Sequence, residues 1–399
     1  MRLLLINAYS SKNRGDAGIV VAMIHLIRKV YPNAEIKVMS SYFEENEDFY
    51  KQYNVKSVSA IWNLKHGNSM LERYFIGFNI VRNILFKKNI KGVEHLLNAD
   101  AVFSVGGGYL YSSRKGPFGI GLLNALFHIW IAKKFNKILY CFPQSVGPLR
   151  SKVDKRLVTY VLRKVDKFIS REPITTELLK RELRLTNVME IPDIGFTLPA
   201  KEFDININKN KVNIGITVLD WKFAKKDATD VDIEAYLNRI SEACKSLMKE
   251  MGNCHFSIFP QVTVGDGDSD LLVSQKLNEK LGKESSTIID LDKIDNFPEY
   301  LVGIYGQMDL FIGSRMHSTI FALAGNTPTI SLAYQYKTTG TFRAIELNEY
   351  SLNIADFTAD QLFIIMKNIL IGKNYPIEKV SNKIKNTKDS LQNIIRTLD

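Results

Sequence analysis

Arginine and histidine stand two positions apart just after an apolar run, Leu310–Gly313, that is typical of a buried strand. The guanidinium of Arg315 offers fixed, paired donors to phosphate or carboxylate groups. Histidine is the side chain whose ordinary pKa lies near neutral pH, so His317 is a candidate for general acid or base catalysis. Because a cation at a helix start is unfavourable without a bound anion, this segment predicts a site for a small, highly charged anion.

A lysine follows the next apolar strand, Thr329–Leu332, and is expected beside the same sheet edge. Lys337 would add a second cation to Arg315 and His317, and such a cluster suits a compact, highly charged donor molecule. A solvated loop lysine is the alternative interpretation of Lys337.

A polar loop containing glycine also follows the first strand, Arg2–Asn7, and opens a helix. Backbone N–H groups and the helix dipole favour an anion or a sugar hydroxyl there. Asp16 in this loop is either the N-cap of the helix or a ligand-binding group. The segment has neither a Walker A pattern nor a GxGxxG fingerprint, so a nucleoside phosphate is not indicated.

Three further polar segments follow strands of the first half. Gly106-Gly107-Gly108 is either a backbone nest for an anion or a tight turn. Gln144 can hydrogen-bond a sugar, although turn chemistry alone explains the glycine and prolines around it. Arg171 is either an anion clamp that reaches into the cleft or half of an exposed ion pair with Glu172. For Asp193 too, an exposed ion pair and a place in the cleft are both open.

Strands and helices alternate in two blocks, which predicts an α/β protein with two doubly wound, Rossmann-like domains facing a cleft. The expected ranges are 1–195 for the first domain and 210–372 for the second, joined through the Pro-, Asn- and Lys-rich segment Pro192–Lys211. Residues 373–399 are expected to form a C-terminal helix that crosses back onto the first domain.

The net charge of +11 is unevenly distributed. Residues 1–200 carry 30 basic and 16 acidic side chains, whereas the remainder is slightly acidic. The first half therefore suits an anionic partner such as a phosphate-bearing lipid, a sugar diphosphate or nucleic acid. No nucleic-acid motif and no aromatic–basic interleaving occur, so we expect no nucleic-acid partner.

The number of cysteines and the hydropathy of the sequence predict where in the cell the protein is located. Three cysteines without a CxxC pair indicate a reducing environment and no zinc site. The longest apolar stretch, Pro117–Ala132, is too short to span a bilayer. It is either a core helix or, because Lys133, Lys134 and Lys137 follow, a helix on a membrane surface. The expected location is cytoplasmic, with peripheral contact at the inner membrane face.

The ordered set of these motifs resembles the polysaccharide pyruvyl transferase family. The motifs are Asn13…Gly15-Asp16, Gly106-Gly107-Gly108, Gln144…Gly147-Pro148, Arg171-Glu172, Pro192-Asp193, Arg315-Met316-His317 and Tyr334…Lys337. The resemblance implies a GT-B-like fold and, as donor, phosphoenolpyruvate. It implies a cell-surface glycan sugar as acceptor and a pyruvate ketal as product, with no cofactor. A GT-B glycosyltransferase that uses a nucleotide sugar is the alternative.

The resemblance maps the family's donor site onto Arg315, His317 and Lys337, and the residue types and their positions suggest the other roles. His317 and Asp16 are the catalytic candidates, the latter as a base or orienting group for an acceptor hydroxyl. The donor-binding candidates are Arg315, Lys337, Ser314, Ser318 and Lys222. The acceptor-binding candidates are Asn13, Gly15, Gly106, Gly107, Gly108, Gln144 and Arg171. Leu219 stands where the family commonly has an arginine. The basic first domain fits an acceptor carried on a polyprenyl diphosphate.

Overall fold

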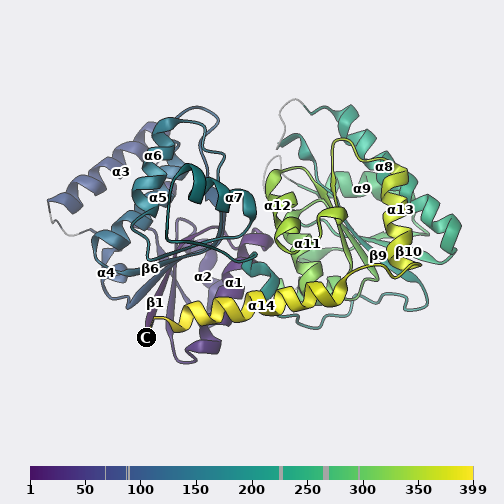
Figure 1. Cartoon of the computed structure of the whole chain (residues 1–399), viewed down its shortest axis with the longest axis horizontal. Coiled ribbons are helices and arrows are strands. Elements are labelled where there is room, and N and C mark those ends of the chain that lie inside the picture. Colours follow the sequence, from purple (N-terminus) through teal and green to yellow (C-terminus); the bar gives the residue numbers. More distant parts are fainter. Residues whose placement is uncertain are drawn as a thin grey trace. The chain divides into compact units, whose positions relative to one another are not determined.

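The computed structural model describes residues 1–67, 69–86, 88, 90–223, 228–263, 269–294 and 297–398. For Phe223 it describes the backbone alone. The chain divides into two compact units. The first comprises Met1–Ile194 together with Thr387–Asp399, and the second comprises Gly195–Asn386. Figure 1 shows helices around the parallel sheet of each unit.

The first unit contains a parallel sheet in the order β3-β2-β1-β4-β6-β7-β8, with β5 paired to β6. Its strands are β1 (Arg2–Ala8), β2 (Glu35–Ser40), β3 (Lys56–Ser59), β4 (Ala101–Ser104), β5 (Gly107–Leu110), β6 (Ile138–Val146), β7 (Lys167–Ser170) and β8 (Val188–Glu190). The chain order reverses direction between β1 and β4. In doubly wound sheets, ligands bind at the carboxyl ends of the strands at such a point.

The segment Gly106-Gly107-Gly108, for which a backbone nest or a tight turn is expected, instead has its last two residues at the start of strand β5. A Cβ on Gly106 would lie 2.7 Å from the carbonyl oxygen of Pro143, so a side chain there would separate the two segments. Strand β6 continues through Pro143, where its register with β7 shifts. Such an irregularity is where a strand tolerates a residue without an N–H group.

The helices of the first unit are α1 (Arg14–Val30), α2 (Phe43–Lys51), α3 (Met70–Leu85), α4 (Val93–Leu97), α5 (Ile120–Lys134), α6 (Lys152–Leu162) and α7 (Pro173–Glu177), followed by a π-helical turn at Leu178–Glu182. Helix α5 forms most of the apolar stretch Pro117–Ala132, and residues such as Leu126 and Ile129 are buried in the hydrophobic core. The core-helix interpretation of this stretch is therefore confirmed, and a membrane-surface position for it is wrong.

The second unit has a parallel sheet in the order β11-β10-β9-β12-β13-β14. The strands are β9 (Val212–Thr217), β10 (Cys254–Ile258), β11 (Ser286–Ile288), β12 (Leu310–Gly313), β13 (Thr329–Ala333) and β14 (Ser351–Asn353). The helices are α8 (Asp230–Met251), α9 (Leu271–Leu281), α10 (Pro298–Tyr305), α11 (Met316–Ala324), α12 (Tyr336–Ala344) and α13 (Ala359–Leu370). The direction reverses between β9 and β12, so the loop after β12 lies at the switch point of this sheet.

The last helix, α14 (Ile377–Arg396), ends in the first unit. The hydroxyl of Tyr31 donates to the Ile395 carbonyl oxygen over 3.4 Å. The Lys167 ammonium donates to the hydroxyl of Thr397 over 2.6 Å, and the hydroxyl of Tyr140 lies 3.0 Å from the same oxygen. Among the helices in the described parts of the chain, none has the length and apolar character to cross a membrane.

Candidate functional site

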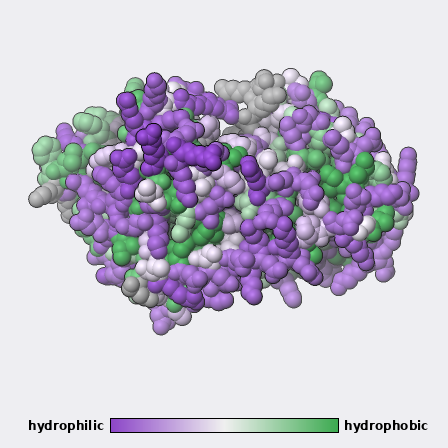
Figure 2. All heavy atoms as spheres, viewed as in Figure 1, coloured by the Kyte–Doolittle hydropathy of each residue, from purple (hydrophilic) through white to green (hydrophobic). Residues whose placement is uncertain are grey.

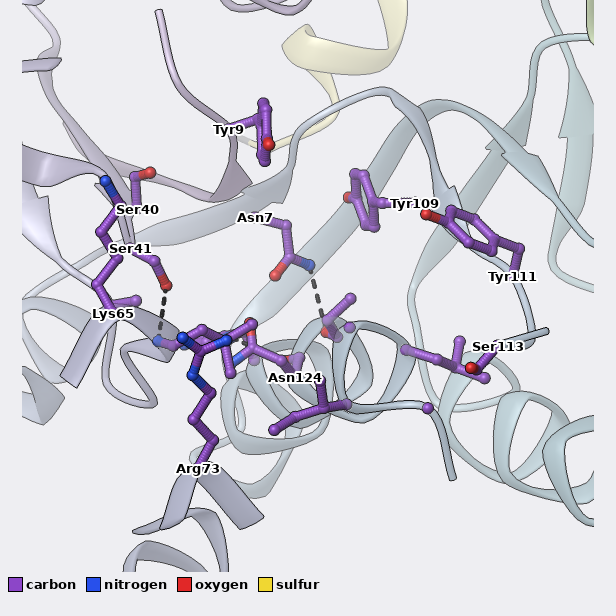
Figure 3. A pocket seen from close by; sticks show the side chains of 18 of the residues that line it. Asn7, Tyr9, Ser40, Ser41, Lys65, Arg73, Tyr109, Tyr111, Ser113 and Asn124 are labelled. Atoms are coloured by element: carbon purple, nitrogen blue, oxygen red, sulfur yellow. Dashed lines mark hydrogen bonds between the residues drawn. The ribbon is translucent and has the colours of Figure 1, made fainter. Parts of the chain in front are cut away.

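A pocket of about 950 Å³ lies in the first unit at the carboxyl ends of its central strands. Its walls come from the ends of β1 and β2, from β5, from the loop before α5, and from the first turns of α3 and α5. Figure 3 shows Asn7, Tyr109 and Asn124 around its floor and Lys65 and Arg73 at its side. The pocket therefore occupies the switch point of the sheet, where the fold favours ligand binding.

The pocket floor is held by polar bonds between neighbouring strands. Asn7 has a left-handed backbone (φ 64°), and its amide donates to the Ser104 hydroxyl over 3.1 Å and to the Ala125 carbonyl oxygen over 3.3 Å. The Tyr109 hydroxyl lies 2.8 Å from the Ser104 oxygen and donates to the Val105 carbonyl oxygen over 2.6 Å. These bonds fix the side chains that a ligand would meet.

Aromatic rings and cations line the rest of the pocket. Tyr9 and Tyr42 meet edge to face, with 4.8 Å between ring centroids, and the Lys65 ammonium lies 4.3 Å from the centre of the Tyr42 ring. The hydrogen-bonded contact with Tyr42, followed by burial, raises the pKa of Tyr9, so its phenol stays neutral. The described charged residues of the lining are Lys65, Arg73, Arg114, Lys115 and Asp16. Aromatic rings can pack against the apolar faces of a sugar, and the net positive charge of the lining attracts a phosphate group.

The start of α1 differs from the prediction for Asp16. Asn13 is the N-cap, and its side-chain oxygen accepts from the backbone N–H groups of Gly15 and Asp16 over 3.1 and 3.3 Å. The N-cap interpretation of Asp16 is therefore wrong; its position in the first turn suits a carboxylate, and it lines the pocket. Asn13 and Gly15 bond to each other in the cap, and neither belongs to the described lining.

Arg171 lies in the interior and not at an accessible surface. Only 2% of the residue is exposed; its Nη1 donates to the carboxylate of Asp193 over 2.7 Å, and its Nε donates to the Ser145 hydroxyl over 2.7 Å. Glu172 instead caps α7 by accepting from the Thr175 N–H. The exposed Arg171–Glu172 ion pair is thus wrong. The buried pair with Asp193 joins the end of β7 to the segment after β8, and the bond to Ser145 joins it to β6.

Gln144 is buried, with 1% exposed, at the end of β6. Neither end of its side-chain amide hydrogen bonds to another described residue. Its backbone pairs with Gly107, whose neighbour Gly108 lines the pocket. A buried amide without hydrogen bonds costs about 1–3 kcal/mol, so Gln144 is well suited to bind a polar group from outside the protein chain.

His128, on α5, is buried and also lines the pocket. Its Nδ1 lies 2.9 Å from the carbonyl oxygen of Asn124 and must donate, because a carbonyl only accepts. Its Nε2 accepts from the backbone N–H of Trp62 over 3.4 Å. Burial lowers the pKa of His128 to about 4, so the ring is neutral at physiological pH.

The depressed pKa of His128 predicts acid sensitivity. Between pH 6.5 and 4 the unfolded chain binds a proton at this ring and the folded chain does not, so stability falls as the pH falls through that window. The loss from this group is about 3 kcal/mol. Urea denaturation at about pH 7 and about pH 4 measures it. The His128→Gln variant is expected to lose less stability across the window than wild type; an equal loss would contradict this account.

The second unit brings three sequence-predicted segments to one sheet edge, because β12 pairs with both β9 and β13. Ser314 and Ser318 are fully buried. The Ser318 hydroxyl donates to the Arg315 carbonyl oxygen over 2.6 Å and lies 2.7 Å from the Thr217 hydroxyl, while Ser314 lies 2.5 Å from the Tyr236 hydroxyl. These serines therefore shape the loop that carries Arg315.

Arg315 is held by a buried carboxylate that the sequence did not single out. Its Nη2 and Nε donate to Asp270 at the start of α9 over 2.6 and 3.1 Å. Asp270 is fully buried and also accepts from the Val262 N–H over 2.9 Å. Arg315 is 9% exposed, so Asp270 fixes the plane of its guanidinium at the helix start.

The other predicted donor-site residues of the second unit have different surroundings. His317 is half-buried in the first turn of α11 and stacks on Phe321 with 6.2 Å between ring centroids. Lys337 is half-buried in the first turn of α12, not in a loop. Lys222 is bound to Asp230 over 2.6 Å and lies 3.4 Å from Asp220. Leu219 is fully buried and belongs to the core.

The sequence model of the polysaccharide pyruvyl transferase family matches residues 13–336, most of the chain. The chain belongs to the polysaccharide pyruvyl transferase family. This family member is 23% identical over 401 residues to the amylovoran biosynthesis protein AmsJ of Erwinia amylovora, covering 93% of this chain and 92% of that protein. The family match contains each candidate site residue except Lys337.

Solved structures show that the fold of this family member is GT-B-like, as predicted. The UDP-GlcNAc 2-epimerase of Methanocaldococcus jannaschii superposes with a TM-score of 0.58 at 12% identity, over 100% of this chain and 99% of that one. The spinosyn rhamnosyltransferase SpnG superposes with a TM-score of 0.57 at 11% identity, over 100% and 99% of the two chains. At such identities the likeness concerns the fold alone.

Proposed function

We propose that the protein transfers the pyruvyl group of phosphoenolpyruvate to a sugar of a cell-surface polysaccharide or of its lipid-linked precursor, forming a pyruvate ketal. The family match over residues 13–336 carries this proposal. The similarity to an amylovoran biosynthesis protein supports a role in polysaccharide biosynthesis. The aromatic and cationic lining of the pocket in the first unit supports a sugar acceptor that bears phosphate.

The donor is proposed to bind in the second unit. Arg315, oriented by Asp270, and Lys337 bind the phosphate and carboxylate of phosphoenolpyruvate. Both side chains begin helices that follow adjacent parallel strands, and the N–H groups of a helix start favour the same anion.

The reaction replaces one carbon–oxygen bond of the donor with two bonds to the sugar. Protonation of the methylene carbon makes the neighbouring carbon electrophilic, and the first sugar hydroxyl adds to it. The bond from that carbon to the phosphate oxygen breaks, and the second hydroxyl closes the ketal. The two sugar hydroxyls lose two protons in total. The methylene carbon gains one proton as it becomes a methyl group, and the phosphate gains the other and leaves as hydrogen phosphate.

His317 and Asp16 are the proposed acid and base. The His317 imidazolium protonates a donor oxygen or assists the departure of phosphate. Asp16 lines the polar pocket of the first unit, where a carboxylate can orient an acceptor hydroxyl or accept its proton. Gln144, whose buried amide lacks hydrogen bonds to the described chain, is proposed to bind the acceptor sugar.

A thermal-shift panel of phosphoenolpyruvate, UDP, GDP and CMP tests the donor class. A ligand that binds only the folded state raises the melting temperature. We expect phosphoenolpyruvate to raise it in wild type and to raise it less in Lys337→Gln. A rise with a nucleotide and none with phosphoenolpyruvate would favour a nucleotide-sugar glycosyltransferase and contradict the proposal.

A further inference from the structure

Helix α3 has an apolar face that the protein leaves exposed. Leu71 is 82% exposed, Phe75 66% and Phe78 65%, and Leu85 continues the stripe. These positions follow the i, i+4, i+7 spacing of one helix face and fall within about 80° of arc at about 100° per residue. Figure 2 shows hydrophobic residues gathered at the edge of the molecule where Figure 1 places α3.

The opposite face of α3 is already covered by the core. Ile76, Ile80 and Val81 pack against the hydrophobic cluster of the first unit. A Cβ on Gly77 would lie 2.3 Å from the Trp62 ring, so the helix sits directly on that ring. A helix that is apolar on both faces normally has both faces covered. The exposed stripe is therefore a second apolar face, separate from the face that packs on the core, and no other part of the described chain packs against it.

Basic side chains lie in the exposed stripe and in the segments that adjoin α3. Arg82 lies within the stripe, and Lys88 and Lys91 are exposed just beyond the helix. The Tyr74 hydroxyl donates to the Phe118 carbonyl oxygen over 2.7 Å, which ties α3 to the loop that carries exposed Arg114 and Lys115. Exposed phenylalanine and leucine flanked by lysine and arginine are the composition of helices that lie in the interface of an anionic membrane.

We propose that the outer face of α3, formed by Leu71, Phe75, Phe78, Arg82 and Leu85, binds an anionic lipid surface. An anionic lipid surface fits this face better than a second protein copy, because the charges around the stripe are almost all positive. The acidic residue within α3 is Glu72. The membrane contact predicted for the stretch Pro117–Ala132 is thereby assigned to a different helix.

The position of α3 also connects the membrane to the pocket. Met70, Arg73 and Tyr74, in the first turns of the same helix, line the pocket wall. A docked α3 therefore holds one wall of the pocket at the lipid surface, where a sugar on a membrane-anchored diphosphate is presented. This last step rests on the proposed function, whereas lipid binding by α3 does not.

Vesicle co-sedimentation of the full chain, without donor or acceptor, tests the proposal. Wild type is expected to bind vesicles that contain phosphatidylglycerol and to bind pure phosphatidylcholine vesicles weakly. Phe75→Ser/Phe78→Ser is expected to lower the partition coefficient at least about tenfold, since two large apolar groups no longer leave water. Arg82→Gln/Lys88→Gln is expected to lower it about tenfold for the anionic vesicles alone.

Leu272→Ser is the matched control, because it removes an exposed leucine from α9 of the second unit and is expected to leave vesicle binding unchanged. Phe78→Trp gives an independent readout: its fluorescence is expected to shift to the blue when vesicles are added. Equal sedimentation of wild type and the double-serine variant, or no blue shift, would overturn the proposal. So would a lipid-free dimer that the double-serine variant abolishes. A transferase test that fails while these results hold would refute the function only.

Discussion

His317→Ala is expected to lower the turnover of phosphoenolpyruvate by about 10²–10⁴-fold, the range that general acid–base assistance supplies. His317 lies in the first turn of α11, two residues after Arg315, at the switch point of its sheet. The loss is expected in kcat more than in KM, because the imidazole is proposed to act on the departing phosphate and Arg315 and Lys337 to bind the donor. Phosphate release under saturating donor measures it.

His255→Ala is the matched control for this variant. His255 is also a half-buried histidine of the second unit; it lies in β10 and is 3.1 Å from the Thr287 hydroxyl. It is expected to keep wild-type turnover. Equal turnover of His317→Ala and His255→Ala would remove His317 from the mechanism, provided that both variants melt at the wild-type temperature.

Asp193→Ala is expected to lower the free energy of unfolding by about 3–5 kcal/mol. The substitution leaves the Arg171 guanidinium buried at 2% exposure without the carboxylate that lies 2.7 Å away. Taking one partner from a buried pair costs more than the pair contributes, because the remaining charge keeps its desolvation penalty. Urea denaturation of the variant and of wild type measures the difference.

Two further variants separate charge burial from packing. Arg171→Met/Asp193→Leu replaces both charges with apolar groups and is expected to recover most of the lost stability. Glu182→Ala breaks the exposed pair with Lys155, whose atoms are 2.6 Å apart, and is expected to have a far smaller effect. If Asp193→Ala were no more harmful than Glu182→Ala, the buried pair would not hold the end of β7 to the segment after β8 as described.

The alternation of strands and helices was sufficient to predict two doubly wound sheets, because the period of apolar residues changes with each element. Helix α3 escaped prediction since apolar residues occupy both of its faces and blur the period of 3.6. Helix α12 escaped because Thr338, Thr339 and Gly340 are weak helix formers, which made Lys337 look like a loop residue. In α12, tertiary packing overrides the weak local preference for helix.

The candidate site, too, could be predicted from the sequence only in part. Strand ends could be predicted to carry Asp16 and Gly108 to one pocket, because parallel strands share an edge. The pairing of Arg315 with Asp270 joins residues 45 positions apart, and sequence periodicity holds no signal for such contacts. Arg171 illustrates the converse, since a charged residue at a strand end suggested an accessible clamp, whereas its partner Asp193 lies in the interior.

The most direct measurement of the central claim is product formation from phosphoenolpyruvate and a lipid-linked saccharide extracted from glycan-producing cells. The account predicts that wild type releases inorganic phosphate only when the saccharide is present. It also predicts a ketal methyl group on the sugar by NMR, with both signals lost in His317→Ala. Sugar transfer from a nucleotide donor by wild type, with phosphoenolpyruvate left unconsumed, would contradict it.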